Sequence, residues 1–183
     1  MLRFALFYAA LFMGANPAMA LDPGLLEGLK IGEMKPLAVH ATPKPAGEAD
    51  FTDPEGGSHS LSDWQGRVVL LNFWAVSCVP CREEMPSLNS LEKEIGGEDF
   101  AVVPVAFGYN HAGGLARFIA NYEIDALPVL LDPGRALSAQ MGVIAPPVTV
   151  LLDRGGLEVA RFIGGADWAS DEAKAVIRAL IDE

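Results

Sequence analysis

The chain contains two cysteines, Cys78 and Cys81, and two residues separate them. Residues 68–73, just before the pair, are mostly β-branched or large and apolar, which predicts a buried strand. After the pair, apolar residues recur at steps of three and four, which predicts a helix with one buried face. We therefore expect Cys78 where a strand ends and a helix begins.

This position favours thiol chemistry. The free N–H groups and the positive end of the dipole at a helix N-terminus stabilise a thiolate relative to a thiol. Pro80 suits the first helical turn, which needs no N–H from it. Cys81 lies about one turn after Cys78, close enough to form a disulfide with it. We expect Cys78 to attack a partner's disulfide and Cys81 to resolve the resulting mixed disulfide.

Two other interpretations of the cysteine pair are weaker. A structural zinc site needs four ligands, and the three histidines, His40, His59 and His111, are scattered without a matching spacing. A purely structural disulfide would close a very short loop and remove little entropy from the unfolded chain. The sequence therefore favours a redox-active disulfide, with no metal and no other cofactor.

Residues 73–86 have the pattern FWA-x-x-C-x-PCR-x-EMP. This segment resembles the membrane-side thioredoxin-like proteins of the TlpA, ResA and CcmG group, and TlpA in particular. The resemblance extends from about residue 33 to the C-terminus. It implies an α/β thioredoxin fold, in which a central mixed β-sheet is flanked by helices and preceded by an N-terminal β-hairpin. It also implies a thiol–disulfide oxidoreductase.

The resemblance gives Glu84 a candidate catalytic role. The family has an acidic residue at this position, near the cysteine pair. A partly buried carboxyl group has a raised pKa and could exchange a proton when Cys81 attacks. The alternative is an ordinary glutamate on the solvent face of the helix.

Pro147 matches the cis-proline of the family, which packs against the disulfide and offers its backbone to an extended substrate. The alternative is an ordinary trans Pro-Pro pair. Pro146 departs from the family pattern, because it has no N–H and one backbone hydrogen bond to a substrate should be missing. Substrate contacts are expected from five residues around the cysteines: Trp74, Val79, Pro80, Pro146 and Pro147.

Residues 1–20 are typical of a secretory signal. A short positive region at Arg3 precedes an apolar stretch and a small-x-small site at residues 18–20. The unbroken apolar part is about ten residues, fewer than the ~20 that a spanning helix needs. An uncleaved membrane anchor is the alternative. Either one places the cysteines in the periplasm, where disulfides persist.

The formal net charge of −11 argues against nucleic acid and anionic lipid as partners. We expect residues 21–50 to form a short helix and an extended connection, and residues 51–183 to form one thioredoxin-like domain. A monomer is expected. Pro104 predicts a bulge or break in a strand over residues 100–107, and Asp167 is the predicted cap of the last helix.

Three functions are compatible with these residues. The first is a periplasmic dithiol reductase of partner proteins, such as copper-site assembly proteins, an oxidase copper-binding subunit or apocytochromes, re-reduced by a membrane thiol donor. The second is a disulfide oxidase or isomerase. The third is a copper chaperone, which the narrow cysteine spacing and Pro147 disfavour.

Overall fold

The computed structural model describes residues 23–183, so the predicted signal or anchor at residues 1–20 lies outside it. The strands are β1 Ala38–Pro45, β2 Phe51–Thr52, β3 Ser58–His59, β4 Val68–Trp74, β5 Phe100–Phe107, β6 Leu130–Asp132, β7 Val148–Leu152 and β8 Leu157–Ile163. The helices are α1 Pro23–Gly28, α2 Val79–Ile95, α3 Ala112–Asn121, α4 Ala136–Gln140 and α5 Asp171–Ile181, with short 3-10 helices at Gly32–Met34 and Leu61–Trp64.

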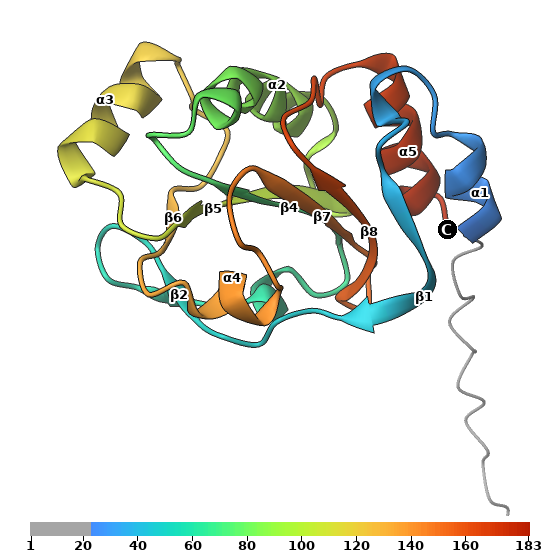
Figure 1. The fold of residues 1–183 in the computed structure, drawn as a ribbon, viewed down its shortest axis with the longest axis horizontal. Coiled ribbons are helices and arrows are strands. Elements are labelled where there is room, and N and C mark those ends of the chain that lie inside the picture. The colour runs from blue at the N-terminus through green and yellow to red at the C-terminus, as the bar shows by residue number, and fades with distance from the viewer. Residues whose placement is uncertain (1–22) are drawn as a thin grey trace, which may run out of the picture.

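The strands form one mixed sheet in the order β1-β8-β7-β4-β5-β6-β2-β3. Helices α2, α3 and α5 lie over one face, and α4 lies over the other (Figure 1). Strand β4 is central: it pairs parallel with β5 and antiparallel with β7, and all of its residues are buried. A strand covered on both faces has an uninterrupted apolar sequence. This architecture confirms the predicted α/β class.

The extended stretch after α1, predicted as a connection, contains an edge strand. Strand β1 pairs antiparallel with β8. His40 Nε2 lies 2.7 Å from Glu158 Oε1, and Arg161 donates to both oxygens of the same carboxylate. The prolines that suggested a connection, Pro43 and Pro45, are tolerated because an edge strand has one side without a partner.

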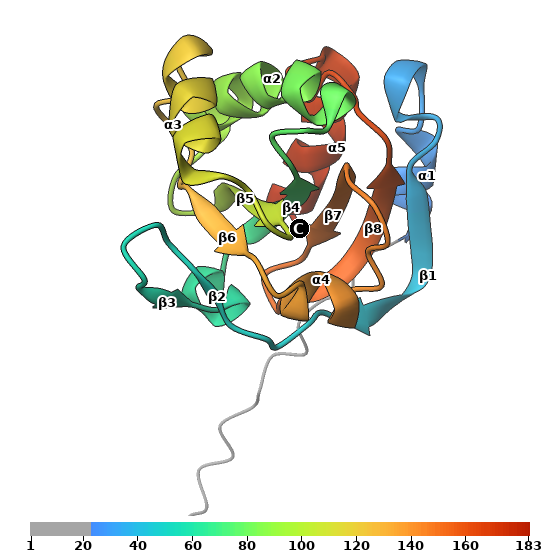
Figure 2. The ribbon, with the colours of Figure 1, turned by 60° about the vertical axis from the view of Figure 1, so that its left-hand side comes forward.

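The predicted N-terminal hairpin is confirmed. Strands β2 and β3 pair with each other, and β2 also pairs with β6, so the hairpin lies at the opposite edge of the sheet from β1 (Figure 2). Among residues 23–183, no helix combines the length and the apolar character needed to cross a bilayer.

Two local predictions are wrong. Strand β5 runs through Pro104 without a register shift, with Pro104 opposite Asn72. Strand β6 pairs with β5 only from Val105 onward, so one side of β5 has no partner strand at the proline. Helix α5 begins later than predicted, because Ser170 and not Asp167 caps it; the Ser170 hydroxyl accepts the Ala173 N–H.

Candidate redox site

Cys78 and Cys81 form a disulfide at the N-terminus of α2, with an S–S distance of 2.05 Å. Cys78 is the N-cap residue, and its sulfur accepts the backbone N–H of Cys81 at 3.3 Å. Cys81 is fully buried, whereas Cys78 is partly exposed. Cys78, at the helix N-terminus, is therefore the more accessible of the two cysteines.

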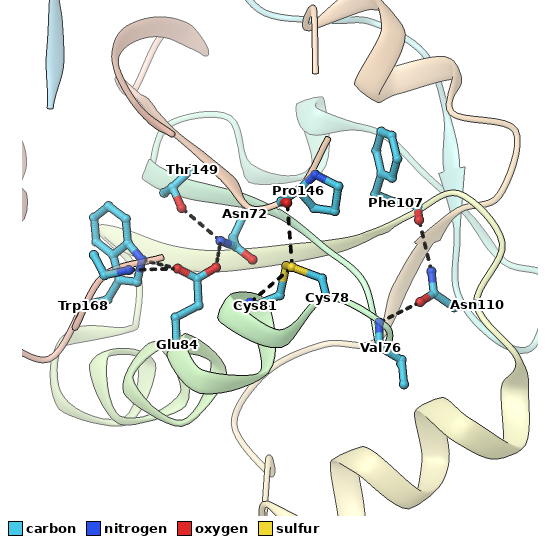
Figure 3. The surroundings of a disulfide bond; sticks show 11 residues. Asn72, Val76, Cys78, Cys81, Glu84, Phe107, Asn110, Pro146, Thr149 and Trp168 are labelled. Atoms are coloured by element: carbon cyan, nitrogen blue, oxygen red, sulfur yellow. Dashed lines mark hydrogen bonds between the residues drawn. A yellow bond between two sulfur atoms is a disulfide. The ribbon is translucent and has the colours of Figure 1, made fainter. Parts of the chain in front are cut away.

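The loop before β7 closes over the disulfide. The peptide bond between Pro146 and Pro147 is cis, which confirms the prediction for Pro147. The Pro146 carbonyl oxygen lies 3.7 Å from Cys78 Sγ and points toward the sulfur atoms (Figure 3). Pro146 can therefore offer a carbonyl to an extended partner here, but no N–H.

The Glu84 side chain points inward beneath α2 and is only 3 % exposed. One carboxylate oxygen accepts Asn72 Nδ2–H at 2.9 Å, and the other accepts Trp168 Nε1–H at 3.1 Å (Figure 3). The Ala166 N–H is a further donor at 3.3 Å. Burial raises the pKa of Glu84 to about 7, although these hydrogen bonds act to lower it. Glu84 is thus a buried acid that can exchange a proton near neutral pH.

Asn72 is a fully buried polar residue in β4 that the sequence prediction does not include. Its Nδ2 donates to Thr149 Oγ1 at 2.9 Å as well as to Glu84. In the described part of the chain, its Oδ1 is the one buried side-chain oxygen or nitrogen without a hydrogen-bond partner. The signal available in the sequence is an amide inside an apolar strand. No such signal predicts the hydrogen bond that Trp168 donates to Glu84, because Trp168 lies in the distant loop before α5.

The remaining predicted site residues lie at different depths. Trp74 is 3 % exposed and packs against Phe118, with ring centroids 5.3 Å apart, so its side chain lies in the core. Val79, at the start of α2, is 59 % exposed. Pro80 is also exposed and lines two hollows, one of which is also lined by Cys78.

The two hollows differ in charge. The hollow on the Glu84 side has a volume of about 330 Å³. Four carboxylate side chains line it: Glu33, Glu83, Glu84 and Asp167. The hollow on the Cys78 side has a volume of about 650 Å³, and its one charged lining residue is Arg135. No group of three or more His, Cys, Asp or Glu side chains within residues 23–183 is arranged to hold a metal ion.

Comparison with known proteins assigns the family. A family model described as Redoxin matches residues 41–177. The chain belongs to the Redoxin family. This chain is 38 % identical over 104 residues to the thioredoxin-like protein YneN of Bacillus subtilis. The aligned residues cover 56 % of this chain and 59 % of YneN. It is 30 % identical over 113 residues to the thiol-disulfide oxidoreductase ResA of Bacillus thuringiensis. That alignment covers 62 % of this chain and 64 % of ResA. The chain thus spans about three fifths of the length of these curated relatives.

Solved structures agree with this assignment. A Chlorobium tepidum structure assigned as thiol:disulfide interchange protein DsbE superposes with a TM-score of 0.65 at 28 % identity, covering 75 % of this chain and 97 % of that one. The exposed lipoprotein thioredoxin of Streptococcus pneumoniae superposes with a TM-score of 0.60 at 26 % identity, covering 74 % and 99 %. The Redoxin chain therefore has a thioredoxin-like fold, and its resemblance to the TlpA, ResA and CcmG group is confirmed.

Proposed function

We propose that the protein is an exported thiol–disulfide oxidoreductase that acts as a dithiol reductase of partner proteins. The observation that carries this proposal is the disulfide between a partly exposed Cys78, at the tip of α2, and a buried Cys81. The names of its relatives, which include thiol-disulfide oxidoreductase and thiol:disulfide interchange protein, support the same chemistry.

The proposed reaction begins from the reduced protein. The Cys78 thiolate attacks one sulfur of the partner's disulfide, forming a mixed disulfide and releasing the partner's other sulfur as a thiolate. Cys81 then loses its proton and attacks Cys78 Sγ. This forms the Cys78–Cys81 disulfide and releases the second partner thiolate, so two electrons pass from the protein to its partner. Glu84, one helical turn after Cys81, takes up the Cys81 proton.

The proposed partners are disulfide-bearing proteins of cytochrome oxidase copper-site assembly or cytochrome c assembly. A membrane thiol donor returns the Cys78–Cys81 disulfide to the dithiol. The chain acts as a monomer in the periplasm, released or held at the membrane through residues 1–20. Neither nucleic acid nor a metal ion takes part.

A trapping experiment tests the proposed roles of the two cysteines. With Cys81→Ser, Cys78 can attack but nothing resolves the product, so a mixed disulfide with the partner should accumulate. The adduct is detected on a non-reducing gel and its partner identified by mass spectrometry. Cys78→Ser is the matched control and should trap nothing. Equal trapping by the two variants would show that the assignment of attacking and resolving sulfur is wrong.

The direction of electron flow is tested by the reduction potential of the Cys78–Cys81 couple, measured in glutathione buffers. A reductase requires a potential low enough to pass electrons to partner disulfides. A strongly oxidising potential would instead favour the disulfide oxidase or isomerase.

A further inference from the structure

The hollow on the Cys78 side forms a groove at the surface, and it contains one positively charged side chain in a strongly acidic chain. The groove is lined by Ala75, Ser77, Cys78, Pro80, Phe107, Gly108, Tyr109, Pro133, Arg135 and Pro146. Arg135 is the only charged residue of this lining, although the chain carries a formal net charge of −11. The positive charge that shares this groove with the reactive sulfur therefore differs in sign from the protein as a whole.

The backbone holds Arg135 in an unusual conformation. Its φ of 58° and ψ of 32° lie in the left-handed region, which residues other than glycine and asparagine rarely adopt. Asp132 fixes the turn: its carbonyl accepts the Arg135 N–H at 3.0 Å, and its Oδ1 accepts the Ala136 N–H at 2.7 Å. A long cationic side chain at a strained position is a reason to look for a function there.

The turn places the Arg135 guanidinium over an aromatic ring. Its Cζ lies 5.6 Å from the centroid of the Phe107 ring, at the end of β5. No carboxylate of residues 23–183 forms an ion pair with it. Stacking orients a guanidinium but leaves the N–H groups at its edge free to bind a planar anion such as a carboxylate.

The lack of an N–H group at Pro146 makes side-chain contacts such as those of Arg135 more important for binding a partner. Pro146 can accept a hydrogen bond from an extended partner but cannot donate one. With one backbone hydrogen bond absent, contacts with the partner's side chains must contribute more of the binding. Tyr109, which is 83 % exposed, offers an apolar surface in the same groove.

We propose that this groove binds an extended segment of the partner protein that carries an aspartate or glutamate close to its reacting cysteine. Arg135 binds that carboxylate and so determines which partner disulfides react fastest with Cys78. The proposal rests on the proposed thiol–disulfide exchange. On the other side of Pro80, the hollow lined by Glu33, Glu83 and Asp167 repels an acidic segment, which fixes the side on which such a partner lies.

Single-turnover exchange with model peptides tests this proposal. The full mature chain is reduced, the reductant is removed, and the protein is mixed with cystine peptides that are identical except for one residue. Glu, Gln or Lys is placed at each of the three positions on either side of the cysteine. The rate of peptide thiol release measures the reaction, in which each peptide disulfide gains two electrons and Cys78 and Cys81 become oxidised.

At the peptide position where the varied residue has the largest effect, we expect the Glu peptide to react about two- to fivefold faster than the Gln peptide. The Lys peptide should react more slowly still. The preference should diminish at 1 M salt, because an exposed ion pair is screened there. Arg135→Gln should bring the Glu-to-Gln ratio close to one, and Arg135→Glu should make the Lys peptide the faster one. Arg117→Gln, an equal charge change at an exposed position of α3, should keep the original ratio.

Different results would disprove the proposed thiol–disulfide exchange and the proposed selection by Arg135. If no peptide is reduced by the wild-type protein, the proposed exchange itself is wrong. If all peptides react at equal rates, or if Arg117→Gln abolishes the preference as fully as Arg135→Gln does, exchange stands and selection by Arg135 is wrong. Reversal of the preference by Arg135→Glu would identify the guanidinium as the selecting group, because a general loss of folding cannot reverse an order of rates.

Discussion

At the residue scale, the buried carboxyl group of Glu84 links the stability of the oxidised protein to pH. Its pKa is raised from 4.5 to about 7, so between these values the folded protein binds a proton that the unfolded chain has lost. The free energy of unfolding should therefore fall as pH rises from about 4.5 to 7, by up to about 3 kcal/mol. Glu84→Gln should remove this fall, as urea unfolding at pH 5 and pH 8 would measure.

Glutamine is a suitable replacement because the site can bind it. Its carbonyl can accept Trp168 Nε1–H, and a rotated Asn72 amide can accept from its NH₂ group through the now unpaired Oδ1. The difference between wild type and variant isolates Glu84 from the other titrating groups. If the two pH profiles run parallel, the carboxyl group does not hold its proton in the folded state, and its proposed role in the Cys81 step loses its basis.

The residues of the site differ in how far the sequence predicts them. Cys78 and Cys81 belong to a local pattern, and the cis bond at Pro147 was expected from the family resemblance; the structure shows both the disulfide and the cis bond. The burial of Glu84 follows from its position on the apolar face of α2, but its donor Trp168 does not. Trp168 is brought to Glu84 by the path of the chain between β8 and α5, which no local pattern encodes.

At the scale of elements, α2 places the two cysteines in unequal surroundings. Cys78 caps the 17-residue helix and is partly exposed, while Cys81 lies inside the first turn and is buried. In the reduced protein, iodoacetamide should therefore modify Cys78 faster than Cys81, by about tenfold or more. The measurement compares two single-cysteine variants at pH 7, Cys81→Ser and Cys78→Ser. Similar rates, or faster reaction of Cys81, would contradict the proposed order of attack.

Elements were predictable where one apolar face decides the structure, and less so where a helix cap or strand pairing decides it. The buried stripe of α2 follows from its periodicity, whereas β1 exists because β8 offers it an unpaired edge. Pro104 shows the converse, since a residue that disfavours a central strand is accepted where the neighbouring strand β6 has not yet begun. Such outcomes depend on neighbours that are distant in sequence.

At the scale of the whole molecule, residues 23–50 are part of the same folded unit as the redox site. Strand β1 extends the sheet at β8, and Glu33 accepts the Asp167 N–H at 2.8 Å in the loop that leads to Trp168. The loop also donates the Ala166 N–H to Glu84. The N-terminal segment therefore supports the loop that holds the buried acid, a role that its proline-rich sequence does not suggest.

Two neighbouring leucines of α1 allow a test of this integration. Leu26 is fully buried, where α1 contacts α5 and β1, whereas Leu25 is 43 % exposed. Leu26→Ala should lower the free energy of unfolding of the whole protein by about 2–5 kcal/mol, because it leaves a cavity in the shared core. Leu25→Ala, the same chemical change on the outer face, should cost less than about 0.5 kcal/mol.

Urea unfolding followed by tryptophan fluorescence, which reports on buried Trp74 and Trp168, would measure both effects. If neither variant shifts the transition, α1 is a separate appendage and the N-terminal segment does not stabilise the redox site; a large shift for Leu26→Ala alone means that the segment and the site unfold together.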